Sequence, residues 1–215
     1  SVSLMALYYG YAHLNGWIAS VIDPTGAGKY DSLAIGADGL PLVSYYSDTG
    51  SVLKIAHCGY TACLSATVSI VHGFTLEGQV PVDARSSLAI GADGYGIIAY
   101  TTGGLLKVAH CLNVRCDSSA YRTVDEQGTT SPYPPSIAID PSGRAVIAYN
   151  DAGLLAVAHC ASVDCSESTT FKSAQDWLYF APSLGFGPDG LPLIAHTGEL
   201  IGILAVTHCG NPFCT

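Results

Sequence analysis

The chain has 215 residues, of which 49% are apolar and 12% are charged, and this composition excludes an intrinsically disordered protein. Its formal net charge is −9 with only eight lysines and arginines, so no basic face can form to bind nucleic acid or an anionic membrane surface. No apolar run reaches the roughly 20 residues of a membrane helix, so we expect no membrane insertion.

Residues 1–29 are expected to form part of a β-repeat that begins inside the repeating unit. Residues 4–9, 11–13 and 17–22 each resemble one strand of the units that follow. The sequence opens at Ser1 with no visible signal peptide, which predicts a processed or excised product.

A repeated unit occupies the rest of the chain, in segments 30–83, 84–133, 134–181 and a shorter segment 182–215. Each unit opens with an alternating segment, such as 32–39, that ends in Asp-Gly or Ser-Gly. This pattern predicts a strand and a tight turn, because glycine supplies the positive φ that such a turn needs. A second strand, a second glycine turn and a third strand ending in His-Cys follow. A fourth strand is clearest at 66–71 and 120–124.

All eight cysteines fall into four pairs with Cys-x4-Cys spacing, and the first cysteines of the pairs lie 53, 49 and 49 residues apart. Even, local pairing predicts four disulfides and an oxidising compartment. The alternative, structural zinc, requires two pairs to meet, and we expect no metal because stacked repeats hold the pairs apart. The predicted disulfide cysteines are Cys58 and Cys63, Cys111 and Cys116, Cys160 and Cys165, and Cys209 and Cys214.

Four short antiparallel strands per unit predict an all-β chain folded as a β-propeller of about five four-stranded blades, with the first and last blades incomplete in sequence. A parallel β-helix is the alternative, but its coils are shorter than this unit. Residues 32–58, SLAIGADGLPLVSYYSDTGSVLKIAHC, resemble the blade repeat of secreted bacterial β-propeller repeat proteins. The resemblance covers residues 32–215. It implies the propeller architecture and leaves the substrate open.

The two ends leave strands without obvious partners, because the first unit lacks its first strand and the last unit lacks its fourth. The interpretation that we favour is closure of the ring within one chain. The alternatives are that copies join through their ends by strand addition, or that the chain is a fragment of a longer repeat protein. The residues expected to complement the open blade are Trp17, Ile18, Ala19, Ser20, Val21 and Ile22.

A histidine precedes each first cysteine, at His57, His110, His159 and His208, with His13 as a weaker equivalent. A ring of metal ligands is one interpretation. The other, which we favour, is a half-buried imidazole that hydrogen-bonds the backbone, because the third strand lies too far from the axis for these residues to converge. The Cys-x-x-Cys-His order of haem attachment does not occur, and no cofactor is expected.

Tyr45, Tyr100 and Tyr149 recur at one position of the second strand, where the last unit has His196. They could form a sugar-binding face, although packing between blades is the simpler interpretation. Asp38, Asp93 and Asp189 occupy the first turns, where aspartate favours the turn itself.

These observations predict a non-catalytic extracellular or cell-surface protein with a structural or adhesive role. Self-assembly into filaments by strand complementation between the incomplete end blades is one way in which it could perform that role. Its expected partner is itself, with glycans as further candidates. The alternatives are a carbohydrate- or protein-binding propeller and a propeller-type glycoside hydrolase. We expect no enzyme activity, because no spaced carboxylate pair interrupts the repeat.

Overall fold

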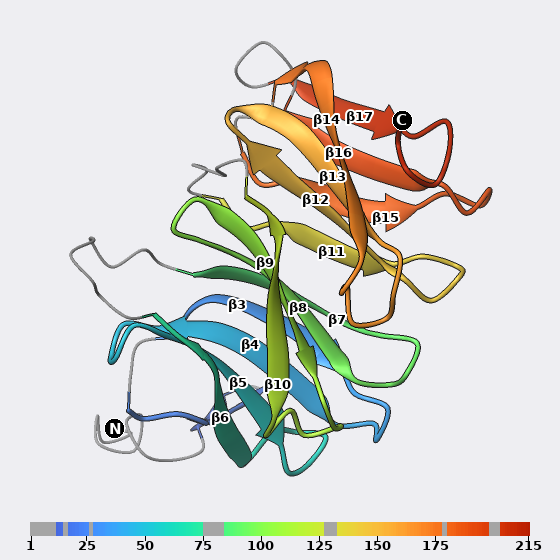
Figure 1. Cartoon of the computed structure of the whole chain (residues 1–215). Coiled ribbons are helices and arrows are strands. Elements are labelled where there is room, and N and C mark those ends of the chain that lie inside the picture. The colour runs from blue at the N-terminus through green and yellow to red at the C-terminus, as the bar shows by residue number, and fades with distance from the viewer. Residues whose placement is uncertain are drawn as a thin grey trace.

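The computed structural model describes residues 12–14, 17–25, 28–74, 84–126, 133–177, 180–197 and 203–215. These residues form 17 strands in five antiparallel sheets, and the described part of the chain contains no helix (Figure 1). It accordingly offers no apolar helix of the length that crossing a bilayer requires. The expected strand at 4–9 lies outside the described residues.

Three sheets are complete blades and two are smaller. Blade 1 consists of β3 (Gly28–Ile35), β4 (Pro41–Ser47), β5 (Val52–Cys58) and β6 (Ala66–Gly73). Blade 2 consists of β7 (Arg85–Ile90), β8 (Gly96–Thr102), β9 (Leu105–Cys111) and β10 (Ser119–Asp125). Blade 3 consists of β11 (Ser136–Ile139), β12 (Ala145–Asp151), β13 (Leu154–Cys160) and β14 (Ser168–Trp177). Blade 4 has three strands, β15 (Ser183–Phe186), β16 (Pro192–Thr197) and β17 (Leu204–His208). A separate hairpin contains β1 (Ala12–Leu14) and β2 (Trp17–Ala19).

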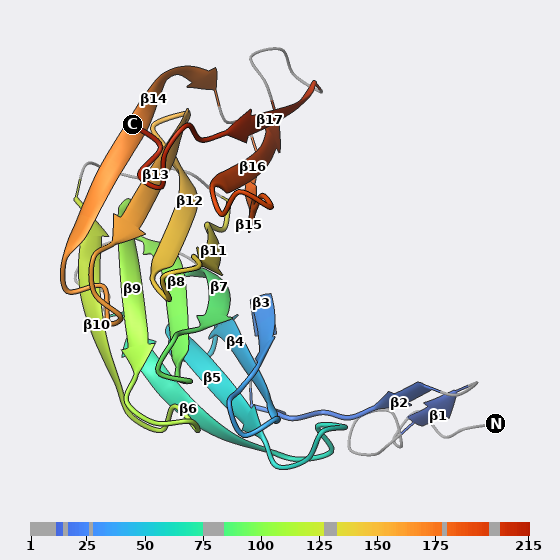
Figure 2. The same cartoon turned by 90° about the vertical axis from the view of Figure 1, so that its right-hand side faces the viewer.

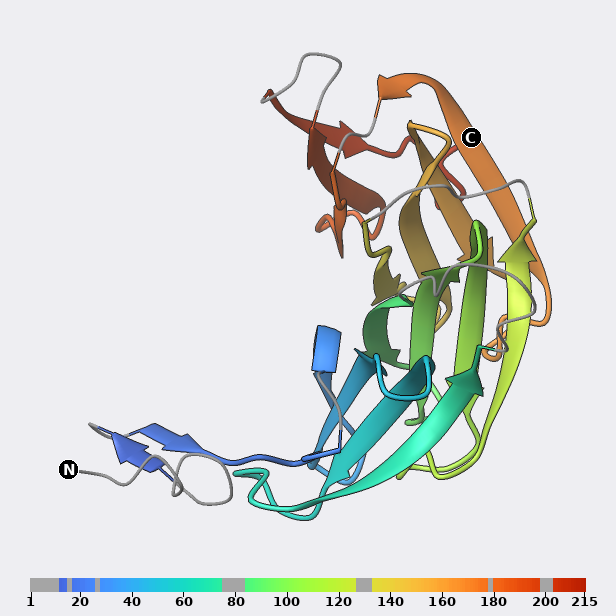
Figure 3. The same ribbon diagram turned by 90° about the vertical axis from the view of Figure 1, so that its left-hand side faces the viewer.

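The four blades stand side by side in an open arc, as Figures 2 and 3 show. The first strands β3, β7, β11 and β15 line its concave side, and the fourth strands β6, β10 and β14 lie on its convex side. This arrangement confirms the predicted propeller architecture. The β1–β2 hairpin projects from the blade 1 end of the arc, far from β17 (Figure 2). Closure of the ring by residues 17–22 of the same chain is therefore not observed.

The first turn of each blade follows from an Asp-Gly or Ser-Gly pair. The glycine has a positive φ in all four blades, between 77° and 85°, which side chains other than glycine rarely adopt. In blade 1 the Asp38 Oδ1 atom also accepts a hydrogen bond from the Leu40 N–H at 3.1 Å, which fixes the turn.

The hydrophobic core lies between blades, in three separate clusters. Leu53 and Ile55 of blade 1 pack in one cluster with Leu88 and Ile98 of blade 2. The next two clusters join blade 2 to blade 3 and blade 3 to blade 4 in the same way. Burying each such side chain contributes about 1.5–3 kcal/mol, so a blade depends on its neighbours for stability.

All four predicted disulfides are present, each between cysteines five residues apart. The second cysteine has a positive φ in every case, from 50° to 56°. A loop of this size closed by a disulfide gains about 2 kcal/mol from chain entropy, which offsets the cost of that backbone conformation.

Candidate functional site at the blade junctions and the two end faces

The same hydrogen bond joins the first strands of successive blades at all three internal junctions. A serine hydroxyl of one blade accepts the bond from a backbone N–H of the next blade. The three bonds run from Leu88 N to Ser32 Oγ at 3.0 Å, from Ile137 N to Ser87 Oγ at 3.3 Å, and from Leu184 N to Ser136 Oγ at 3.0 Å. The serine that opens each repeat therefore sets the register between neighbouring blades.

The turn glycines form a second repeated contact between blades. A Cβ atom on Gly94 would lie 2.8 Å from the Ala37 Cβ, and one on Gly143 would lie 2.6 Å from the Ala92 Cβ. Glycine is required here both by its positive φ and by the close approach of the preceding blade. Gly39 of blade 1 has the same φ but no atom within 4 Å of its Cβ position.

The repeated tyrosines form a third contact, and all three side chains are buried. The Tyr100 hydroxyl lies 2.8 Å from His72 Nδ1 of blade 1, and the Tyr149 hydroxyl donates to Asp125 Oδ2 of blade 2 at 2.7 Å. Burial, together with the Lys107 charge, lowers the pKa of His72 to about 4, so its ring is neutral at pH 7. The structure thus places Tyr100 and Tyr149 in the packing between blades, and it places Tyr45 in the packing of blade 1 beside a small cavity.

Tyr45 of blade 1 completes this pattern with a residue that precedes the blade. Its hydroxyl donates to Asp23 Oδ2 at 2.7 Å, and Lys54 Nζ donates to the same oxygen at 2.9 Å. Burial raises the pKa of Asp23, but hydrogen bonds from Thr25, Lys54 and Tyr45 outweigh it and hold that pKa well below its usual range. Ser20 adds a bond from its hydroxyl to the Cys63 carbonyl at 2.6 Å.

The blade 4 end of the arc exposes apolar side chains that are buried in other blades. Leu204 and Val206 of β17 are 78% and 62% exposed, whereas their counterparts Leu53 and Ile55 in blade 1 are fully buried. We call the surface of Ser183, Leu193, Leu204 and Val206 the head face. It is the face that a following blade would cover.

The blade 1 end exposes the opposite face. Leu33 and Ile35 of β3 are 62% and 55% exposed, whereas Leu88, the counterpart of Leu33 in blade 2, is buried against blade 1. We call the surface of Leu33, Ile35, Gly39 and Val43 the tail face. It is the face that a preceding blade would cover.

Strand β17 also has an edge with no strand beside it among the described residues. A cavity of about 210 Å³ lies next to this edge, between β17 and the β13 and β14 strands of blade 3. Leu155, Val157 and Phe171 line its apolar side. A fourth strand of blade 4 would lie here.

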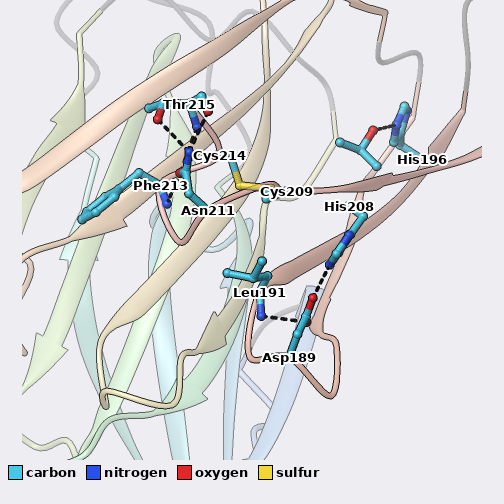
Figure 4. The surroundings of a disulfide bond; sticks show 10 residues. Asp189, Leu191, His196, His208, Cys209, Asn211, Phe213, Cys214 and Thr215 are labelled. Atoms are coloured by element: carbon cyan, nitrogen blue, oxygen red, sulfur yellow. Dashed lines mark hydrogen bonds and ion pairs between the residues drawn. A yellow bond between two sulfur atoms is a disulfide. The ribbon is translucent and has the colours of Figure 1, made fainter.

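Each histidine that precedes a cysteine lies against an aspartate of its own blade's first turn. The distances from His Nε2 to Asp Oδ2 are 2.8 Å for His57 and Asp38, 2.8 Å for His110 and Asp93, 3.1 Å for His159 and Asp140, and 2.8 Å for His208 and Asp189. Figure 4 shows the last pair beside the Cys209–Cys214 disulfide. The partner is thus a carboxylate, not the backbone that the sequence suggested. The pairs are distributed one to a blade, and no described cluster of three His, Cys, Asp or Glu residues could hold a metal ion.

His196 replaces the repeated tyrosine and bonds within its own blade. Its ring nitrogens lie 2.8 Å from Thr207 Oγ1 and 3.0 Å from the Thr197 carbonyl. The repeat pattern did not predict Asp140 as the partner of His159. It also did not predict Asp23, His72 and Asp125 as the partners of the tyrosines.

Comparison with known proteins identifies a fold and no family. No protein-family model matches the chain, and no curated protein matches it. Among solved structures, a protein of unknown function from Dyadobacter fermentans aligns with a TM-score of 0.61 at 14% identity, over 90% of this chain and 63% of that one. The α-L-arabinanase of Penicillium chrysogenum, complexed with arabinobiose, aligns with a TM-score of 0.61 at 13% identity, over 89% and 66%. The Dos1 propeller aligns with a TM-score of 0.57 at 13% identity, over 86% and 46%. The chain therefore spans less than two thirds of the length of these proteins.

Proposed function

We propose that this protein is a non-catalytic extracellular structural or adhesive propeller, which self-associates by strand complementation between its incomplete end blades. One observation carries the proposal. Among the described residues no strand pairs with the outer edge of β17, which lies beside a cavity, while a segment at the other end of the arc, residues 20–23, stands where the end of a fourth strand belongs.

Residues 20–23 contact blade 1 at the same two places at which the fourth strand of blade 2, β10, contacts blade 3. There, Arg122 donates to Asp164 in the disulfide loop of blade 3 at 2.9 Å, and Asp125, three residues later, accepts from Tyr149. In blade 1 the same two places are contacted by Ser20, which bonds Cys63 in the disulfide loop, and by Asp23, again three residues later. The 20–23 segment therefore lies against blade 1 in the position that the end of a preceding blade's fourth strand would occupy.

An extracellular, non-catalytic role agrees with the chemistry of the described residues. Four local disulfides persist best in an oxidising compartment. The turn aspartates are held by histidines, and the Asp23 carboxylate accepts hydrogen bonds from Thr25, Tyr45 and Lys54. Carboxylates engaged in this way are poorly placed to act as the acid and base of a glycosidase.

Electron microscopy and light scattering of the unreduced protein test the proposal. We expect rings or filaments whose mass grows with protein concentration. Val21→Pro removes a backbone N–H from the 20–23 segment that strand addition would use and fixes its backbone, so it should abolish growth. Val21→Thr keeps the N–H and the β-branched shape, so it should assemble like the unaltered chain.

A population of 22.2 kDa monomers at every concentration would contradict self-association. It would favour the second candidate, a carbohydrate-binding module. That alternative is supported by a cavity of about 210 Å³ lined by Asp31, Val43 and Tyr45, and titration with arabino-oligosaccharides would then test it.

A further inference from the structure

The head face and the tail face are the two halves of one repeated interface. At each internal junction the head side of one blade buries leucine, isoleucine and valine side chains against the tail side of the next. At the ends of the arc the same two surfaces are open. We propose that the head face of blade 4 packs against the tail face of blade 1 of a second copy, so that copies join head to tail as successive blades.

The hydrogen bond between a serine hydroxyl and the next blade's first strand can also form at the proposed contact. Ser32, Ser87 and Ser136 each accept a hydrogen bond from the first strand of the following blade. Ser183 is the fourth serine of this series, and it is exposed on the head face. Leu33 of the second copy holds the position of the donors Leu88, Ile137 and Leu184, so its N–H would meet the Ser183 hydroxyl.

The glycines of the first turns also indicate a contact between the head face of one copy and the tail face of another. Gly94 packs on Ala37, Gly143 on Ala92, and Gly190 on Pro141. Pro188 holds the position of these partners in blade 4, and Gly39 holds the glycine position in blade 1. Apart from its two chain neighbours, no described residue has an atom within 4 Å of the Cβ position of Gly39, as expected for a turn whose partner lies on another copy.

The apolar side chains fit the same placement. Leu204 and Val206 correspond to Leu53 and Ile55, which are covered by blade 2, and Leu33 corresponds to Leu88, which covers blade 1. A second copy whose tail face packs on the head face in this way brings its 20–23 segment to the edge of β17 that no described strand pairs with. Strand addition and face packing are then parts of one contact, and the inference rests on the proposed self-association.

The contact joins two different surfaces, so it is heterologous. Such a contact produces a ring when the rotation between copies closes, and an open helical filament when it does not. In a ring every copy uses its head face and its tail face, and in a filament every copy does so except the two at the ends.

Two single-face variants test this inference by sedimentation. Leu204→Glu blocks only the head face and Leu33→Glu only the tail face, and both side chains are largely exposed, so folding should be retained. Each variant alone should remain a 22.2 kDa monomer, and an equimolar mixture should form a heterodimer of twice that mass through the one intact pair of faces. Leu112→Glu, at a residue 54% exposed on blade 2, is the matched control and should assemble like the unaltered chain.

The other outcomes separate the face contact from self-association in general. If either variant alone still assembles, the face contact is wrong while self-association through another surface stands. If the mixture stays monomeric, the head-to-tail arrangement is wrong. If the unaltered chain is a monomer throughout, both proposals fail. Val206→Lys is a second head-face variant and should behave like Leu204→Glu. The unfolding midpoints of all variants distinguish a blocked contact from a loss of assembly that comes from misfolding.

Discussion

The aspartate that contacts the histidine of each blade comes from one of two positions in the repeat, and in both cases its carboxylate reaches the histidine of its blade. Asp38, Asp93 and Asp189 come two residues after a glycine, and a Cβ on that glycine would lie within 2.9 Å of the carboxylate oxygen. In blade 3 the aspartate itself, Asp140, stands at the glycine position, and Ser142 stands where the aspartate would be. The carboxylate still reaches its histidine, His159, at 3.1 Å.

Asp140 is expected to stabilise the fold at neutral pH. Burial raises its pKa, but hydrogen bonds from the Arg144 N–H, Ser142 and His159 outweigh that effect and lower the pKa below its ordinary value. A lowered native pKa gives stability that is complete above the unfolded pKa of about 3.9 and is lost as pH falls through the native value. Asp140→Asn should therefore cost about 1–3 kcal/mol of unfolding free energy at pH 7. The cost should shrink toward pH 2, which urea unfolding at the two pH values measures.

Asp189→Asn is the matched control for this effect. Asp189 makes the same contact with His208, but both side chains are more than 40% exposed, whereas Asp140 is 9% exposed. Solvent screens an exposed pair, so the control should change stability less than Asp140→Asn does. Equal losses in the two variants would mean that burial does not determine the strength of the pair.

The tyrosine partners mark the limit of what the sequence predicts at the scale of single residues. The repeat predicts Tyr45, Tyr100 and Tyr149 at one place, and packing between blades was one of the two interpretations. Their partners are Asp23, His72 and Asp125, which share neither residue type nor a conspicuous motif. A contact made by unlike residues at one structural position leaves no repeat for a sequence comparison to find.

At the scale of strands and turns the sequence was more informative. Alternation and Asp-Gly turns predict β3 to β5, because each short strand is bounded by glycines. The Cys-x4-Cys spacing predicts the disulfide loops, because a local pair needs no knowledge of the fold. The strand expected at 17–22 is shorter, ending at Ala19, and it pairs with β1. Residues 20–23 instead contact blade 1, and those contacts come from tertiary structure.

The contact between turns of neighbouring blades can be measured with two glycine variants. Gly143→Ala places a methyl group in a backbone with φ of +85° and 2.6 Å from the Ala92 Cβ. Gly39→Ala has a φ of +78° and no such neighbour. The positive φ costs each variant about 1–2 kcal/mol, and displacing the neighbouring turn should cost Gly143→Ala about 1–3 kcal/mol more. Denaturant unfolding of dilute protein measures this difference. Equal midpoints would show that the contact between the turns of blades 2 and 3 adapts to a methyl group without loss of stability.

At the scale of the whole molecule, four blades form an arc with unlike ends (Figure 3). Each internal blade is stabilised on both sides, whereas within the part of the chain that the structure describes blades 1 and 4 each pack against one neighbouring blade. The end blades therefore expose surface whose burial would contribute the same apolar stabilisation as an internal junction. The net charge of −9 on every copy opposes that burial, because copies repel one another.

Salt should therefore strengthen self-association. The Debye length falls from about 10 Å at 0.1 M to about 3 Å at 1 M ionic strength, which screens repulsion between copies but leaves apolar contacts intact. At a fixed protein concentration, the weight-average mass from sedimentation should rise between these two conditions, whereas Leu204→Glu should stay monomeric in both. A mass that falls with salt would mean that ion pairs, rather than the apolar head and tail faces, hold the copies together.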